Sequence, residues 1–254
     1  MIQASPRPDW PYPQIIAHRG GGAMAPENTL AAFDMGAALG HQMVEFDAKL
    51  AQDSTVFLLH DDRVDRTSNG HGAAAAMSYE TLSALDAGSW FGPEFAGERM
   101  PTLEQVALRC RALQLAVNIE IKPCPGRDAA TGLLVAQQAL RFWEGVRPAP
   151  LLSSFSVEAL EAAQIAAPDL PRGLLIDEVP ADWLEQARRL GCISLHANHR
   201  RLTPQLAAEI RDAGLYLMVY TVNDPQRVRE LRGWGVDAFC TDRIDLIGPR
   251  FLDA

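Results

Sequence analysis

The sequence predicts an α/β fold, a (β/α)8 TIM barrel with a small subdomain inserted between its second strand and the helix that follows. Short apolar, β-rich runs alternate with amphipathic segments along most of the chain. The runs are nearly continuously apolar, which is typical of a parallel sheet covered by helices. A chain of 254 residues, 48% of them hydrophobic, suits a barrel of this kind. We therefore expect a single domain over residues 1–254.

The β-rich runs number one more than a closed barrel of eight strands needs. They are Ile15–His18, Met43–Lys49, Val56–His60, Leu115–Lys122, Leu151–Phe155, Gly173–Ile176, Cys192–His196, Leu215–Val222 and Asp237–Thr241. Only the short segment around Ala51–Ser54 joins the second run to the third, whereas a parallel crossover needs roughly ten or more residues. These two runs must therefore form an antiparallel hairpin, and eight strands remain for the barrel.

Amphipathic segments between the runs predict the helices. They are Asn28–Leu39, Leu103–Leu113, Thr131–Trp143, Val157–Ala167, Ala181–Leu190, Pro204–Ala213 and Pro225–Trp234. Asn28 can cap the first helix, and Thr102 precedes the second with Gln105 three residues later. Pro204 and Pro225 each suit the first turn of a helix.

Residues 61–100 form the predicted insertion, which we expect to cap the barrel mouth. This segment is rich in Gly, Ala and Ser, and only Ser78–Leu85 has a helical pattern. Trp90 and Phe91 are either the core of this cap or an apolar lip over the site, and the first reading is favoured.

Composition excludes several classes of function. The net charge of −9 and the lack of a basic run argue against nucleic-acid binding. No apolar stretch approaches ~20 residues, so no membrane span is expected. The segment through Pro13 lacks the apolar core of a signal peptide, and four widely spaced cysteines indicate free thiols. We expect a cytoplasmic protein, either a monomer or a homodimer.

Acidic residues lie at the ends of two predicted strands. Glu45 and Asp47 are two residues apart, so their side chains share one face, and Glu120 and Lys122 repeat this spacing. Carboxylates so close together need a cation, and oxygen ligands suit Mg²⁺, Ca²⁺ or Mn²⁺. A surface location is the alternative, but the outer face of a barrel strand is covered by helices.

Two histidines also end β-rich runs, and each is followed by a charged residue. His18 and His60 could divide the roles of acid and base, because imidazole titrates near neutrality. Arg19, beside a glycine-rich turn, is a candidate phosphate ligand. Glu27 either belongs only to a helix start or also orients His18 or Arg19. The remaining histidines are expected to be mostly structural; they are His41, His71, His196 and His199.

Later strand ends carry less distinctive residues. Phe155, Tyr220 and Asn223 could line a slot for a small alcohol, although core packing explains Phe155 equally well.

Taken in order, these residues form a specific set. The set comprises His18-Arg19-Gly20, Pro26-Glu27-Asn28-Thr29, Glu45-x-Asp47, His60-Asp61, Glu120-x-Lys122, Ser154-Phe155, Tyr220-Thr221-Val222-Asn223 and Thr241-Asp242. It resembles the glycerophosphodiester phosphodiesterase family from Ile15 to about Pro249, and most of all the bacterial cytosolic enzyme of that family associated with glycerol-3-phosphate uptake. Tyr220 stands where many members have tryptophan.

The resemblance implies metal-dependent hydrolysis of glycerophosphodiesters to glycerol 3-phosphate and an alcohol. It implies the following roles: one divalent cation, Mg²⁺ or Ca²⁺ with Mn²⁺ as a further option, on Glu45, Asp47 and Glu120; phosphate contacts from Arg19 and Lys122; and an acid–base pair of His18 and His60. Which histidine is the base, and whether water or a glycerol hydroxyl attacks, stays open.

Two other functions are weighed against this one. A lipid-specific phospholipase barrel uses similar residues, but it needs an apolar or basic rim that this acidic chain lacks. A non-catalytic metal- or phosphodiester-binding barrel would be indicated by loss of a histidine or carboxylate, and none is missing.

Overall fold

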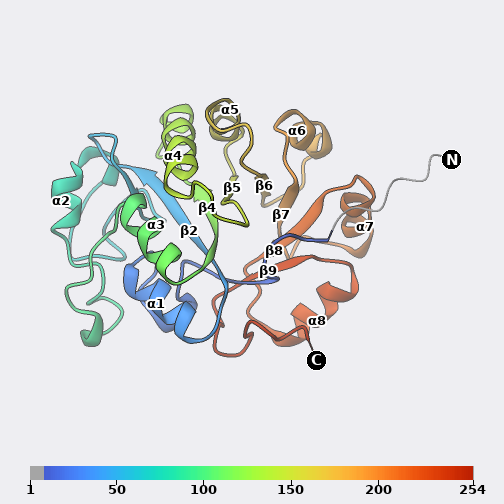
Figure 1. Cartoon of the computed structure of the whole chain (residues 1–254), viewed down its shortest axis with the longest axis horizontal. Helices are drawn as coiled ribbons and strands as arrows, with labels where there is room; N and C mark the ends of the chain where they lie inside the picture. The colour runs from blue at the N-terminus through green and yellow to red at the C-terminus, as the bar shows by residue number, and fades with distance from the viewer. Residues whose placement is uncertain (1–8, 254) are drawn as a thin grey trace.

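The computed structural model describes residues 9–253 and contains a closed barrel of parallel strands (Figure 1). The first eight residues of the segment through Pro13 lie outside that range. The barrel strands are β1 (Ile15–Ala17), β2 (Met43–Leu50), β4 (Ala116–Ile121), β5 (Leu151–Ser154), β6 (Arg172–Ile176), β7 (Ser194–Asn198), β8 (Tyr216–Tyr220) and β9 (Ala238–Thr241). Each pairs with its neighbours in parallel, and β1 closes the barrel by pairing with both β9 and β2. The predicted fold class is confirmed.

The remaining strand, β3 (Val56–Leu58), lies outside the barrel. It pairs antiparallel with the end of β2, and Lys49 lies opposite Phe57. The short connection therefore forms the predicted hairpin, and it carries the chain away from the barrel into the insertion.

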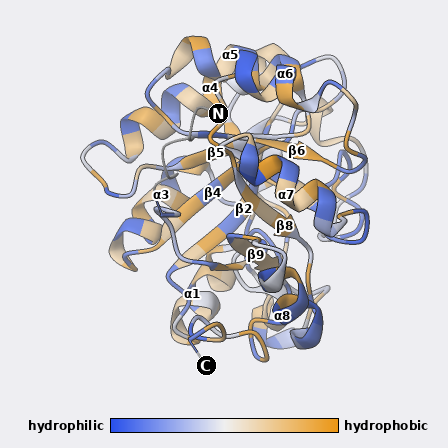
Figure 2. Cartoon of the chain, turned by 90° about the vertical axis from the view of Figure 1, so that its right-hand side faces the viewer, coloured by the Kyte–Doolittle hydropathy of each residue, from blue (hydrophilic) through white to orange (hydrophobic). Residues whose placement is uncertain are grey.

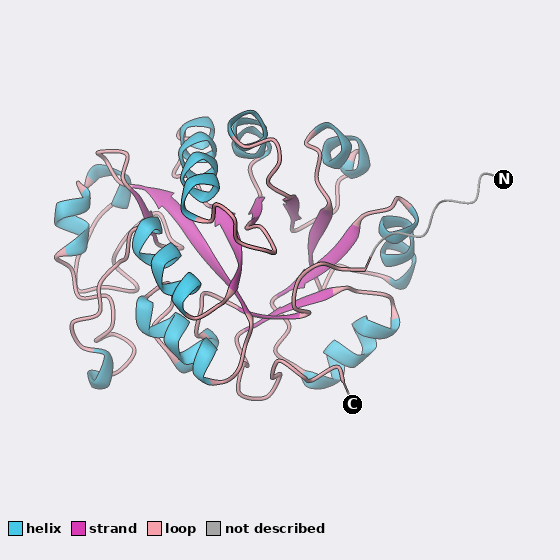
Figure 3. Ribbon diagram, viewed as in Figure 1, coloured by secondary structure: helices cyan, strands magenta, loops and turns pink. Residues whose placement is uncertain are grey.

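Helices surround the strands (Figure 3). They are α1 (Leu30–Ala38), α2 (Tyr79–Ser83), α3 (Leu103–Ala112), α4 (Asp128–Phe142), α5 (Val157–Ala166), α6 (Trp183–Arg189), α7 (Pro204–Asp212) and α8 (Pro225–Gly233). The strands are mostly hydrophobic, and the helices carry their hydrophilic stretches mainly on the outside (Figure 2). Buried side chains such as Ile16, Met43 and Met218 belong to one of the apolar clusters that hold the strands together.

One predicted helix start is right and another is wrong. Thr102 and Gln105 form a reciprocal capping box at α3. At α1, however, the cap is Thr29, whose hydroxyl accepts from the backbone N–H of Ala32. Asn28 instead has a left-handed backbone with φ of 60° and is buried. Asparagine tolerates this conformation because its short polar side chain bonds locally.

Residues between β3 and α3 form α2 and long loops on one side of the barrel (Figure 1). Their buried core is largely aliphatic and includes Val64, Leu82 and Ala87, packed with Phe57 of β3. Trp90 is 40% exposed and stacks edge-on against Phe91, which in turn meets Phe95. These aromatic rings therefore pack against one another within the insertion. The boundaries 61–100 stay a prediction.

The described helices include none that combines the length and apolarity needed to cross a membrane. All four cysteines are free thiols, as their spacing predicted, and all four are buried.

Candidate active site

The three predicted carboxylates come together in the barrel. Asp47 of β2 lies directly beside Glu120 of β4 in the sheet, and Glu45 is two residues earlier on β2. Ligand oxygens of all three side chains lie within 4.8 Å of one another, and all three residues are buried. Register between two neighbouring parallel strands therefore builds a compact acidic cluster.

The electrostatics of this cluster favour a bound cation. Burial, followed by the charge of Asp47, raises the pKa of Glu45 to about 8. The pKa of Glu120 is raised for the same two reasons. Burial would also raise the pKa of Asp47, but nearby cations, Arg19 foremost, lower it. Oε1 of Glu45 is buried without a hydrogen-bond partner among the described residues. Three hard oxygen donors with one unpaired atom fit a divalent cation.

Arg19 follows β1 in a left-handed conformation with φ of 49°. Its backbone N–H donates to Oε2 of Glu45 at 3.0 Å. Its guanidinium donates to Glu27 at 2.7 Å, and Nε lies 3.6 Å from Oδ2 of Asp47. Glu27 therefore orients Arg19, which is one of the two partners that the sequence left open.

Asn28 holds Asp47 in place, a role that sequence reasoning missed. The Asn28 amide donates to Oδ2 of Asp47 at 2.9 Å, and the Asp47 backbone N–H donates back to Oδ1 of Asn28 at 3.1 Å. Both residues are buried. This reciprocal pair fixes the carboxylate relative to the strand.

Lys122 connects the acidic cluster to His60. Its Nζ donates to Oε1 of Glu120 at 2.8 Å and to Nε2 of His60 at 3.1 Å. It also lies 3.7 Å from Asp47 and 5.6 Å from the centre of the Phe155 ring. The ammonium group of Lys122 thus contacts both the carboxylates and an imidazole.

His18 is held by an aspartate at the end of β9. Nδ1 of His18 donates to Oδ1 of Asp242 at 2.6 Å, and Asn223 donates to the other oxygen at 2.8 Å. Nε2 points to the acidic cluster and lies 3.9 Å from Oε2 of Glu45. Burial lowers the pKa of His18, but Asp242 and Glu45 outweigh it and raise the pKa overall. Asp242 was noted in the sequence only as part of the Thr241-Asp242 motif, so its partnership with His18 was missed.

His60 has an equivalent partner. Its Nδ1 donates to Asp61 at 2.7 Å, and Arg66 bonds both Asp61 and Glu27. Burial is the main reason why the pKa of His60 is lowered. The contacts fit a neutral ring with its proton on Nδ1. Arg66 lies in a loop of the insertion, where no strand-end pattern could single it out.

A cleft of about 460 Å³ opens beside these residues. Its lining comprises His60, Asp61, Asp62, Glu120, Ile121, Lys122, Pro123, Ser154, Phe155 and Ser156. Phe155 is 45% exposed, so core packing does not explain it. Tyr220 stacks edge-on against Phe155 at 5.8 Å and donates its hydroxyl to the Ile176 carbonyl. The side-chain amide of Asn223 donates to Asp242, the partner of His18.

Two of the four histidines expected to be mostly structural, His41 and His196, have structural contacts. Nε2 of His41 lies 3.1 Å from the Ile244 carbonyl, and His196 is fully buried beside Ser194.

A family model described as the glycerophosphoryl diester phosphodiesterase family matches residues 18–246. The chain belongs to this family. A glycerophosphodiester phosphodiesterase of Caldanaerobacter subterraneus is 35% identical over 232 residues, which cover 90% of this chain and 93% of the relative. As a member of the family, the protein is a glycerophosphodiester phosphodiesterase, a hydrolase of phosphoric diesters.

Solved structures of relatives share the fold. An Oleispira antarctica phosphodiesterase in complex with the product sn-glycerol-3-phosphate has a TM-score of 0.89 and 32% identity, and covers 96% of this chain and 98% of that one. The Agrobacterium tumefaciens glycerophosphodiester phosphodiesterase has a TM-score of 0.77 and 30% identity, with coverage of 91% and 97%. The likeness to these solved structures therefore covers nearly the whole chain.

Proposed function

We propose that this phosphodiesterase releases glycerol 3-phosphate and an alcohol beside His18 and His60, with one divalent cation on Glu45, Asp47 and Glu120. One observation carries the proposal. Each imidazole has its Nδ1 fixed by an aspartate, so each presents Nε2 to the same acidic cluster and its lysine. Two oriented imidazoles beside a cation site suit a reaction that needs both a base and an acid.

The cation would be Mg²⁺ or Ca²⁺, with Mn²⁺ as a further option, because all three donors are carboxylates. When bound, it would neutralise charge on the phosphate as a Lewis acid. Arg19 and Lys122 lie against the same carboxylates and would contact the remaining phosphate oxygens.

The histidines divide the proton transfers. One accepts the proton of the attacking hydroxyl, and the other donates a proton to the departing alkoxide. Each would contribute roughly 10²–10⁴ to the rate. The attacking group is either water or the neighbouring glycerol hydroxyl.

The alcohol would leave along the wall formed by Phe155 and Tyr220, whose rings stack edge-on. An exposed ring of Phe155 in the cleft supports a role in contacting the head group. The product complex of the Oleispira antarctica relative supports glycerol 3-phosphate as the retained half.

Cytoplasmic location and the choice of monomer or homodimer remain proposals from the sequence, to be tested by cell fractionation and light scattering.

Release of glycerol 3-phosphate from glycerophosphocholine tests this function. Chelator-stripped enzyme is assayed alone and with Mg²⁺, Mn²⁺ or Ca²⁺, and His18→Ala and His60→Ala are assayed in parallel. We expect metal-dependent release and a loss of at least about 10²-fold in either variant. Near-normal turnover by either variant, with the cation still bound, would remove that histidine from the mechanism.

A further inference from the structure

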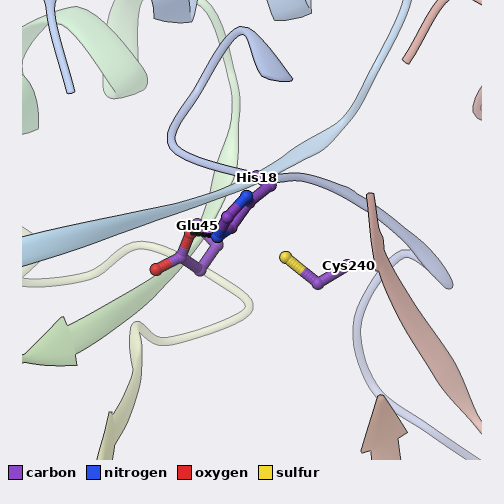
Figure 4. A group of neighbouring side chains, drawn as sticks. All are labelled: His18, Glu45 and Cys240. Carbon is purple, nitrogen blue, oxygen red and sulfur yellow. Dashed lines mark ion pairs between the residues drawn. The ribbon is translucent and has the colours of Figure 1, made fainter. Parts of the chain in front are cut away.

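A second group of metal-ligating side chains overlaps the acidic cluster. Glu45 and Cys240 lie on β2 and β9, and His18 directly follows β1, which pairs with both strands. One ligand atom from each of the three residues lies within 4.8 Å of the other two. Figure 4 shows the Cys240 sulfur directed toward the His18 ring and the Glu45 carboxylate. This group contains nitrogen, oxygen and sulfur donors, whereas the acidic cluster contains oxygen alone.

We propose that His18, Glu45 and Cys240 form a second cation site that selects thiophilic ions such as Zn²⁺, and that filling this site stops catalysis. The inhibitory part rests on the function proposed above, whereas the binding part does not. Three protein ligands and one open position are a common arrangement for zinc.

The orientation of His18 already suits a metal ligand. Asp242 accepts from Nδ1 of His18 at 2.6 Å, so Nε2 is left to face Glu45. A carboxylate behind a metal-bound histidine fixes its tautomer and its orientation in the same way. The site therefore has an outer partner as well as its direct ligands.

Glu45 has an unpaired oxygen that a cation at either site could use. It is 4% exposed, and its Oε1 has no hydrogen-bond partner among the described residues. Leaving a buried carboxylate oxygen unpaired costs free energy, which a bound cation would relieve.

The distances need only small adjustments. Ligands of a tetrahedral zinc ion lie about 3–4 Å apart, and Nε2 of His18 is already 3.9 Å from Oε2 of Glu45. Burial raises the pKa of the Cys240 thiol, so the ion must displace the thiol proton to solvent as the sulfur–metal bond forms. Hard ions such as Mg²⁺ and Ca²⁺ have little affinity for sulfur, which restricts the site to softer cations.

Inhibition follows from the shared residues. A cation bound at this second site would use Glu45 as a ligand, so Glu45 could no longer bind the cation of the acidic cluster. It would also occupy Nε2 of His18, the atom proposed for proton transfer. The two sites therefore cannot be filled independently.

Cobalt(II) tests binding directly, because a thiolate bound to Co²⁺ gives a charge-transfer band in the near ultraviolet. We expect the metal-free wild-type enzyme to show this band at one equivalent of Co²⁺. Cys240→Ala should lose it, with cobalt affinity at least about tenfold weaker. Cys110→Ala is the matched control, since Cys110 is also a buried free thiol but lies in α3, and it should keep the band.

Absence of the band in the wild type, or its persistence in Cys240→Ala, would overturn the site. If Cys240→Ala is poorly folded by circular dichroism, Cys240→Val, which fills more of the thiol's space, replaces it.

Zinc inhibition tests the proposal that filling this site stops catalysis. Zn²⁺ is added to enzyme working with Mg²⁺, and each variant's rate is divided by its own rate without zinc. We expect the inhibitory zinc concentration to rise at least about tenfold in Cys240→Ala and to stay unchanged in Cys110→Ala. Equal inhibition of both variants would overturn the inhibitory role. If no variant hydrolyses glycerophosphocholine at all, the proposed function fails, while the cobalt band still decides whether the metal site exists.

Discussion

Nδ1 of His18 lies 2.6 Å from Oδ1 of Asp242, although 224 residues separate them in the chain. Closure of the barrel between β1 and β9 brings them together. The Asp242 carboxylate thereby fixes the ring of His18 and also raises its pKa.

Replacing Asp242 by asparagine tests this relationship. Without the carboxylate, the pKa of His18 should fall, so the limb of the pH–rate profile that reports His18 should move to lower pH. Turnover should fall by at least about tenfold, part of the full contribution of an acid–base group. Asp245→Asn removes a charge that pairs with Arg243, and its profile should match the wild type. An unmoved limb in Asp242→Asn would contradict the role given to Asp242.

Replacing Lys122 by methionine should separate cation binding from turnover. Nζ of Lys122 donates to Glu120 and lies 3.7 Å from Asp47, so its loss leaves the acidic cluster more negative. We expect tighter Mg²⁺ binding by calorimetry but roughly 10²-fold slower turnover, because a charge facing the phosphate is gone. Lys122→Arg should restore part of the rate. Weaker Mg²⁺ binding in Lys122→Met would refute this account.

Asn28 offers a test of how Asp47 is held. Asn28→Gly keeps the left-handed backbone accessible but removes both side-chain bonds to Asp47. We expect cation affinity to drop by about 10- to 100-fold, as for other residues that position metal ligands. Asn28→Ala should lose the same affinity and, in addition, about 1–2 kcal/mol of unfolding free energy from backbone strain. Equal stability of the two variants, measured in urea, would rule out the strain.

His196 should limit stability in acid. Burial lowers its pKa from 6.5 to about 3, so the unfolded chain binds a proton before the folded protein does. The contribution of neutral His196 to the free energy of unfolding is complete above pH 6.5 and is lost as the pH falls toward 3. Within this window each pH unit lowers the free energy of unfolding by about 1.4 kcal/mol.

Urea unfolding of the wild type and His196→Gln from pH 7 to pH 4 measures this contribution. The free energy of unfolding should depend less steeply on pH in His196→Gln than in the wild type. The control His71→Gln changes an exposed histidine, with a side chain that is 86% exposed, and should keep the wild-type slope. Identical slopes in wild type and His196→Gln would show that His196 is not responsible.

Sequence patterns were sufficient for the barrel and for the acidic cluster. Alternating apolar runs identified the strands, and the short Ala51–Ser54 connection identified the hairpin. The Glu45 and Asp47 spacing identified the face that carries the carboxylates, because side chains alternate along a strand. These features depend on local geometry, which a sequence displays directly.

Residues that act through another residue were harder to predict. Asp242 pairs with His18 only because the barrel closes, and nothing near either residue specifies the contact. Asn28 has the chemistry of a good helix cap, so the local pattern favoured that role over its bonds to Asp47. Arg66 lies in a loop, where strand ends give no guide.

Arg66 donates to both Glu27 and Asp61, and these two carboxylates orient Arg19 and His60. One guanidinium thus connects the residue that orients Arg19 with the residue that orients His60. In evolutionary terms these residues are linked, because a change at Arg66 removes a partner from two carboxylates at once. We expect Glu27, Asp61 and Arg66 to be kept or exchanged together among descendants of this chain, even where the rest of the insertion drifts.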